Sequence, residues 1–468
     1  MKSLFLQDIL ERIDGTVVQG SGNPLIQDVT YRPKKIGDQT LLFYRYKDMK
    51  IDKNLFQKYK SVVIVTDLEE KFKNLGKDVL LIKVSNVEEA YWKFVNFYRN
   101  LFQIHVIGIT GTCGKTTTKQ MVKHILRKHY RVHSTFLSNN QRALNLKYLL
   151  GIDDETGAAV FEMPVASPGY LTNTIQYFQP QIRILLNIDV YHLKDCKTPE
   201  AYMKAKAEII NGLDPKTGII LLNADDENIK KVLDIKGFHN VIYFGFSEGC
   251  HFQAKDIRYA DGGMQFTLIH QDQTFPVFVT GYGKPNVYNA LASIAAASFA
   301  GMDIQECCER LASFEQMNEH LEFLDGTGGC TIIDDTWNAA PLSMASALEV
   351  LQETSRSKTK IALLGYMPQL GDSQYATEQY AKMGEKAVET QIDHLFVVGE
   401  EALEIGKKAL ELGMDPNKVY FCNSGTEIYQ ILKPYLHQDA TVLLKIPHRV
   451  MVQDSFKDLK RKIIACEK

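Results

Sequence analysis

A glycine-rich segment that ends in lysine and threonine is the part of this chain best suited to chemistry. Residues 108–118 read Gly-Ile-Thr-Gly-Thr-Cys-Gly-Lys-Thr-Thr-Thr, between an apolar run at 104–107 and a helix-like segment at 119–126. Glycines let backbone N–H groups close around phosphate oxygens, and a helix N-terminus adds a favourable dipole. In such a loop Lys115 would reach the terminal phosphates of a nucleotide, and the Thr116 hydroxyl would bind magnesium.

This loop does not meet the strict G-x-x-x-x-G-K-[ST] pattern, because Ile109 stands where the first glycine should be. A variant with glycines at 108, 111 and 114 fits instead. A strand-to-helix turn that binds nothing is the alternative, but Lys-Thr directly before a helix favours ATP. The residues expected to bind the nucleotide here are Gly111, Thr112, Gly114, Lys115, Thr116 and Thr117.

The composition limits the class of protein. A chain of 468 residues is too long for one hydrophobic core and suggests several domains. The formal charge of −2 gives no electrostatic reason to expect nucleic acid as a partner. Eight cysteines without a C-x-x-C pair or zinc spacing, and an acid already at Asp8, lead us to expect a cytoplasmic protein without a signal peptide. The most apolar helix candidate, 290–300, is too short for a membrane span.

Short apolar runs alternate with helix-like segments along most of the chain. This alternation predicts an α/β fold with parallel sheets, and a β-rich stretch at 252–280 interrupts it. We expect three domains, at residues 1–101, 102–314 and 315–468. The strand candidates are residues 61–66, 79–84, 158–162, 182–187, 218–223, 331–334, 360–364, 394–398 and 441–445.

Several polar residues follow these strand candidates, where ligands gather in α/β sheets. Glu162 would emerge near the glycine loop and could hold magnesium, although a helix cap is an equally ordinary role. His192 and Lys206 have ordinary alternatives too, as a packed histidine and as a solvated lysine on an amphipathic helix. The Asp334-Asp335 pair suits acid–base or ribose-binding roles, or simply a capped turn.

The order of seven short segments along the chain resembles the Mur ligases over essentially the whole length. The loop itself looks like the family's T-G-T-N-G-K-T-T, with Cys113 at the usual asparagine. The other segments that resemble family motifs are 139–145, 162–169, 187–192, 205–208, 283–291 and 333–341.

The resemblance implies an N-terminal domain for a UDP-sugar, a central P-loop ATPase with a parallel sheet, and a Rossmann-like C-terminal domain for an amine. It also implies ATP-dependent amide formation through an acyl phosphate, with release of ADP and phosphate. Lys115 and Thr116 would bind phosphate and a first Mg²⁺ with Glu162, and His192 and a carbamylated Lys206 would hold a second. The nucleotide contacts implied beyond the loop are Asn286 and Asn289 at adenine, Asp335 at ribose, and position 320, which the family fills with arginine and this chain with His320.

The substrate-binding motifs depart further from the family than the catalytic ones. Residues 30–32 read Thr-Tyr-Arg where the family has the UDP-contacting D-S-R, and 48–54 replace the element D-G-H-D-F. Tyr366 stands where aspartate is usual, and 445–449 read Lys-Ile-Pro-His-Arg in place of K-G-S-R. These changes leave the acid and the amine open.

Three hypotheses therefore compete. The first is addition of D-Ala-D-Ala to a UDP-MurNAc-tripeptide in peptidoglycan synthesis, which the general pattern of the N-terminal domain favours slightly. The second is a paralogue that joins another acid and amine in specialised metabolism. The third is an ATP-binding scaffold, which the retained Lys115, Glu162 and Lys206 disfavour.

Overall fold

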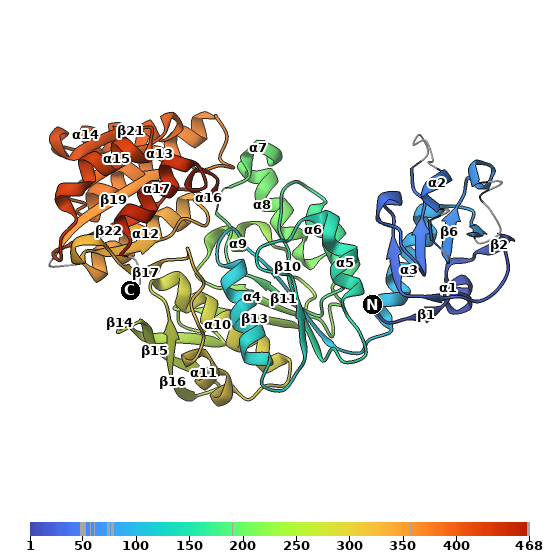
Figure 1. Cartoon of the computed structure of the whole chain (residues 1–468). Coiled ribbons are helices and arrows are strands. Elements are labelled where there is room, and N and C mark those ends of the chain that lie inside the picture. The colour runs from blue at the N-terminus through green and yellow to red at the C-terminus, as the bar shows by residue number, and fades with distance from the viewer. Residues whose placement is uncertain are drawn as a thin grey trace. The chain divides into compact units, whose positions relative to one another are not determined.

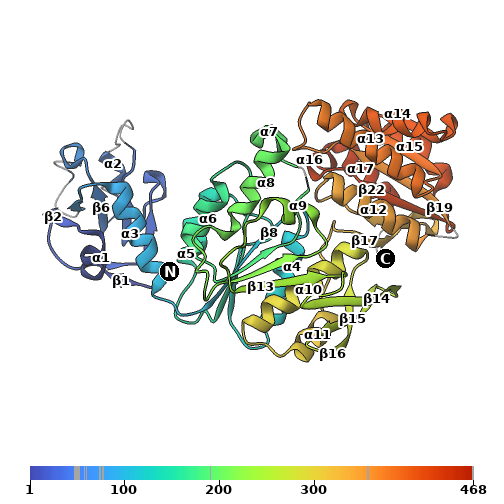
Figure 2. The same cartoon turned by 180° about the vertical axis from the view of Figure 1, so that it is seen from behind.

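The computed structural model describes residues 1–46, 53–56, 58–59, 61–72, 75, 79–189, 191–355 and 358–465. Residues 48–52 of the substituted N-terminal element lie outside this part of the chain. Figures 1 and 2 show the helices and strands of the chain coloured by residue number. By its internal contacts the chain divides into two compact units. One consists of residues 1–108, 129–161 and 172–181, and the other of residues 109–128, 162–171 and 182–468.

The N-terminal sheet has the strand order β2-β7-β6-β5-β4. Its strands are β2 (Thr16–Gln19), β4 (Asp28–Thr30), β5 (Thr40–Phe43), β6 (Val62–Thr66) and β7 (Val79–Lys83). All neighbours are parallel except β2, which pairs with β7 antiparallel. Helix α3 (Val87–Asn100) contacts α1 (Leu6–Ile13), and it begins at Asn86, whose side chain accepts hydrogen bonds from the next turn.

The central sheet has the order β16-β15-β14-β13-β12-β11-β8-β10-β9. Its strands are β8 (His105–Thr110), β9 (Val132–Ser134), β10 (Ala158–Glu162), β11 (Ile182–Leu185), β12 (Ile219–Asn223), β13 (Asn240–Gly245), β14 (Phe252–Ala260), β15 (Gly263–His270) and β16 (Gln273–Thr280). Strands β11 to β14 are parallel, whereas β14, β15 and β16 form an antiparallel meander. The meander is the β-rich stretch expected at 252–280, and the parallel part confirms the predicted alternation.

The C-terminal sheet, orange to red in Figure 1, has the order β17-β18-β22-β19-β20-β21. Its strands are β17 (Glu322–Asp325), β18 (Thr331–Asp334), β19 (Thr359–Gly365), β20 (His394–Val398), β21 (Val419–Cys422) and β22 (Ala440–Lys445). Only β17 is antiparallel to its neighbour.

Helices cover both faces of this C-terminal sheet. One hydrophobic core joins it to α12 (Pro341–Thr354), α13 (Gln374–Glu389) and α14 (Leu403–Glu411). The other core joins it to α15 (Gly425–Leu432) and α17 (Asp454–Ile463). Alternate residues of apolar runs such as Ile361–Leu364 enter the two cores. Because both faces of the strand are buried, its sequence is continuously hydrophobic. The Rossmann-like expectation is thus confirmed.

Helix α10 (Lys284–Phe299) contains the most apolar helix candidate of the sequence and is buried along most of its length. Within the described residues, no helix is both long and apolar enough to cross a membrane. The α/β fold class is confirmed, whereas the domain boundaries after residues 101 and 314 stay predictions.

Candidate active site

The glycine loop joins the end of β8 to helix α4 (Lys115–Leu126). Gly114 has φ +84°, and a Cβ at this residue would collide with the side-chain oxygen of Asn289, so the position requires glycine. The Lys115 Nζ donates to the carbonyl oxygens of Gly111 and Thr112, both at 2.9 Å. The loop therefore folds around its own lysine, with backbone N–H groups at a helix N-terminus, as phosphate binding requires.

Glu162 ends β10 beside this helix and is only 3% exposed. The Thr116 hydroxyl donates to its Oε2 at 3.0 Å. A hydroxyl and a carboxylate oxygen this close are hard ligands of the kind that Mg²⁺ prefers. The structure thus brings together the two residues expected to hold the first ion. Thr112 is held nearby, since its hydroxyl donates to the Asp189 carbonyl at 2.9 Å.

Lys206 lies at the end of helix α8 (Pro199–Ala207) and is 1% exposed. Its Nζ donates to the Gly111 carbonyl at 2.7 Å, the same oxygen that Lys115 contacts. The alternative prediction of a solvated Lys206 is wrong, because helix α8 directs this side chain towards the end of β8. Burial, and then the Lys115 charge, hold the pKa of Lys206 well below its usual value.

His192 lies near Lys206 and has an unsatisfied ring nitrogen. Its Nδ1 is buried and has no hydrogen-bond partner among the described residues. Burial lowers the pKa of His192 to about 3, and the Lys206 and Lys115 charges act in the same direction. A neutral imidazole with an orphaned nitrogen is the form that binds metals. The backbone at His192 has φ +54°, which is uncommon for a residue with a side chain.

Thr116 and Glu162 offer oxygen donors of the kind that suits magnesium. In the part of the chain that the structure describes, no three His, Cys, Asp or Glu side chains gather as a metal site. A first magnesium position at Thr116 and Glu162 stays a prediction, and His192 and Lys206 would need an added anion to form a second one.

A cavity of about 310 Å³ opens next to the glycine loop. The predicted nucleotide contacts that line it are Gly114, Thr117, Asn286, Asn289, His320 and Asp335. The Asn286 Nδ2 donates to the carbonyl oxygens of Thr280 and Gly281 at 2.6 and 2.9 Å. Because both partners are acceptors, the orientation of the amide is fixed, and its oxygen remains as an acceptor for an exocyclic amine such as that of adenine.

The cavity also contains residues that the sequence reasoning missed, notably Tyr288 and Asp225. The Tyr288 hydroxyl donates to Asp225 Oδ2 at 2.8 Å, and its ring stacks on Phe246 with centroids 4.0 Å apart. Tyr288 lies between the predicted contacts Asn286 and Asn289 in segment 283–291. Its place in that motif was the sequence signal that could have identified it as a cavity residue. Asp225 follows β12 without any motif of its own.

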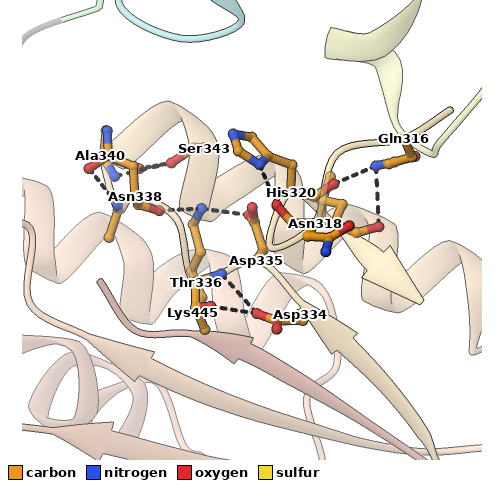
Figure 3. Close-up of polar contacts among 12 residues, drawn as sticks. Gln316, Asn318, His320, Asp334, Asp335, Thr336, Asn338, Ala340, Ser343 and Lys445 are labelled. Atoms are coloured by element: carbon orange, nitrogen blue, oxygen red, sulfur yellow. Dashed lines mark hydrogen bonds and ion pairs between the residues drawn. The ribbon is translucent and has the colours of Figure 1, made fainter. Parts of the chain in front are cut away.

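Figure 3 shows the wall of the cavity that follows β18. Asp335 is 8% exposed, and the Lys445 Nζ contacts its Oδ2 at 2.5 Å. His320 stacks on Trp337 with centroids 5.7 Å apart, and its backbone carbonyl accepts a hydrogen bond from the Gln316 amide. His320 thus lies at the cavity where the family has arginine, and it is held there by ring stacking.

The glycine loop, the buried Glu162 and Lys206 beside it, the neighbouring cavity and the Rossmann-like sheet are together the features expected of an ATP-dependent ligase. Two family models match this chain: the Mur ligase middle domain at residues 109–297, and the Mur ligase glutamate ligase domain at residues 321–445. Together they span more than half of the 468 residues. The chain belongs to the Mur ligase family, whose members form amide bonds at the expense of ATP.

Curated relatives agree with the family models. The UDP-N-acetylmuramoyl-tripeptide--D-alanyl-D-alanine ligase of Bacillus subtilis is 28% identical over 380 residues, which are 81% of this chain and 81% of that protein. The ligase of the same name from Haemophilus influenzae is 24% identical over 456 residues, which are 94% of this chain and 96% of the relative.

Solved structures share the fold over nearly the whole chain. A crystal structure of MurF from Acinetobacter baumannii has a TM-score of 0.82 at 22% identity, covering 99% of this chain and 100% of the other. MurF ligase from Thermotoga maritima in complex with ADP has a TM-score of 0.75 at 24% identity, covering 93% and 98%. The three-domain α/β architecture is therefore that of these ligases.

Proposed function

We propose that this protein joins D-alanyl-D-alanine to a UDP-MurNAc-tripeptide, the reaction for which its relatives are named. The observation that carries the proposal is the assembly of Lys115, Thr116 and Glu162 at the glycine loop, with His192 and Lys206 beside them. These are the residues that acyl-phosphate chemistry needs, because the main task is neutralising charge on the transferring phosphoryl group.

In the proposed reaction the terminal phosphoryl group moves from ATP to the carboxylate of the acid substrate. The amine nitrogen then attacks the acyl carbon, the C–O bond to phosphate breaks, and the nitrogen loses a proton. Lys115 would hold the phosphoryl oxygens, and Glu162 and Thr116 would hold Mg²⁺, which supplies positive charge to the transferring group. ADP, phosphate and the new amide are the products.

We propose a carbamate on Lys206 as the source of the missing anion at the second position. The Lys206 amine would attack CO₂ and release a proton, which converts a cationic side chain into one with two oxygen donors. Burial lowers the pKa of the Lys206 amine, which favours the neutral, nucleophilic form that this step needs. A carbamate beside the orphaned nitrogen of His192 would complete a donor pair for Mg²⁺.

A cleft of about 510 Å³ in the N-terminal unit is our proposed site for the nucleotide-sugar part of the acid substrate. Its wall combines aromatic rings, including Tyr31 and Trp92, with Arg45. Arg45 lies over the Tyr31 ring at 5.3 Å and pairs with Glu88 through two contacts at 2.5 and 2.6 Å. Aromatic faces stack on bases, and guanidinium groups bind diphosphates, so this wall supports a uridine nucleotide.

A second polar cleft, of about 360 Å³, is our proposed site for the amine substrate. It contains two of the substituted positions, Tyr366 and Arg449, and the Arg449 guanidinium lies 4.6 Å from the centre of the Tyr366 ring. Asp372 and Glu401 line the same cleft. A cation held by a ring suits a substrate carboxylate, and the acids suit its ammonium group.

Replacing Arg449 with methionine is expected to raise the KM for D-alanyl-D-alanine about tenfold or more, because a charge-assisted hydrogen bond to the carboxylate is lost. The KM for ATP should stay within a factor of two. Arg461→Met, at an exposed arginine of a different cleft, is the matched control. An unchanged amine KM in Arg449→Met would move the amine site elsewhere.

The test of the whole proposal is phosphate release from ATP with UDP-MurNAc-tripeptide present, before and after D-alanyl-D-alanine is added. Release that requires both substrates is the expected result. ATP binding without release would reject these substrates and favour the paralogue with another acid and amine, as the substituted 30–32 and 445–449 segments would then indicate.

A cytoplasmic location belongs to this proposal, since ATP and a UDP-linked precursor are its substrates. The described cysteines, seven in number, are free, as expected in a reducing compartment.

A further inference from the structure

Lys445 is a buried lysine that ends β22 and contacts Asp335, which lines the cavity beside the glycine loop (Figure 3). It is 1% exposed. Its Nζ contacts Asp335 Oδ2 at 2.5 Å and donates to the Asn338 carbonyl at 2.8 Å. Asp335 lines the cavity, whereas Lys445 does not, so any effect of Lys445 on a nucleotide must act through Asp335.

The register of two neighbouring strands places Asp335 next to Lys445. Strands β18 and β22 are parallel, with Asp334 opposite Leu444, and the Asp335 N–H donates to the Leu444 carbonyl at 3.0 Å. Asp335 and Lys445 are therefore the next residues on neighbouring strands, at the carboxyl edge where ligands gather in such sheets. The pairing follows from the fold and does not depend on a flexible surface contact.

The second hydrogen bond of Lys445, to the Asn338 carbonyl, connects the pair to the segment that carries His192. Asn338 accepts a hydrogen bond from the Tyr191 hydroxyl at its Oδ1, at 3.1 Å, and Tyr191 directly precedes His192. Lys445 is thus held at two points, and its ammonium keeps a fixed place next to Asp335. A buried carboxylate that loses its water shell needs such a partner to stay ionised and ordered.

We propose that Lys445 is a positioning residue for ATP: by holding Oδ2 of Asp335, it presents the other carboxylate oxygen to a ribose hydroxyl. This inference rests on the proposed ATP-dependent function. Asp335 accepts the hydroxyl hydrogen bond, and Lys445 fixes the orientation of the acceptor. The selectivity for a ribose over a deoxyribose then depends on a lysine that never touches the nucleotide.

The chain provides a matched control one residue away. Asp334 is fully buried and pairs with Lys460 at 2.7 Å, yet Asp334 is not part of the described lining of the nucleotide cavity. Removing Lys460 leaves a buried aspartate without its lysine, just as removing Lys445 does. The two variants each remove a lysine from a buried aspartate and differ in which aspartate they affect.

The experiment measures binding of ATP, 2′-deoxy-ATP and 3′-deoxy-ATP with magnesium to the full chain by calorimetry. The unsubstituted protein should bind one deoxy analogue about tenfold to a hundredfold more weakly than ATP, as expected for loss of a hydrogen bond to a charged group. Lys445→Met and Asp335→Asn should both reduce this ratio to about one to three, on the same principle. Lys460→Met should retain the full ratio.

A full ratio in a folded Lys445→Met protein would overturn the proposal. If thermal unfolding shows that Lys445→Met does not fold, Lys445→Leu, which also lacks a hydrogen-bond donor, is measured in its place and is read in the same way. A full ratio in Asp335→Asn would also overturn it, because Asp335 would then not contact the ribose.

The outcome is separable from the proposed substrates, because only nucleotide and magnesium are present in the binding measurement. If the acid or the amine is wrong, phosphate release fails while the deoxy-ATP ratio still follows Lys445. If Lys445 has only a structural role, phosphate release proceeds and the ratio does not change.

Discussion

Lys115→Ala is expected to lower phosphate release from ATP by about 100- to 1,000-fold or more, since it removes a positive charge aimed at the transferring phosphoryl group. The helix that carries Lys115 should remain folded, because its buried side chains, such as Met121 and Ile125, are unchanged. Steady-state phosphate release with both substrates, together with a thermal unfolding curve, measures the two effects.

Lys123→Ala is the control for this variant, because Lys123 lies on the same helix two turns further on. It should retain normal turnover. Normal turnover in Lys115→Ala would instead reject the assignment of residues 108–118 as the phosphate-binding loop.

Lys206→Ala is expected to abolish amide formation, and added bicarbonate should not restore it. Without the amine no carbamate forms, so the second magnesium position loses its anion. Lys206→Glu should recover part of the activity, because it places a carboxylate at the same point. Carbon-13 NMR after exchange with labelled bicarbonate should show a carbamate signal in the unsubstituted protein and none in Lys206→Ala.

Lys204 supplies the control, since it precedes Lys206 by two residues on the same helix and is exposed. Lys204→Ala should keep both the activity and the carbamate signal. Full activity in Lys206→Ala would remove the second-metal proposal, and a persisting signal would place the carbamate on another amine.

The glycine loop could be predicted because its chemistry is local. A strand, three glycines, Lys115-Thr116 and a helix follow one another in the sequence, so no distant contact is needed to recognise them. Glu162 was predictable for a related reason, since strand ends in a parallel sheet share one edge. The alternation of strands and helices gave the fold class in the same way.

Burial of Lys206 could not be predicted from its helix. The polar pattern of residues 201–210 suits a solvated face, and only the packing of α8 against the end of β8 buries that lysine. The Asp335–Lys445 contact could not be predicted from the sequence either, because the two residues are 110 positions apart and meet through strand pairing. Such pairs depend on sheet order, which sequence periodicity does not determine.

The carbonyl oxygen of Gly111 accepts hydrogen bonds from both Lys115 and Lys206. A phosphate that attracts Lys115 would weaken the hydrogen bond from Lys115 to this oxygen. The hydrogen bond from Lys206 to the same oxygen would then change as well. One backbone oxygen therefore links the two lysines, so an event that moves one of them is expected to alter the hydrogen bond of the other.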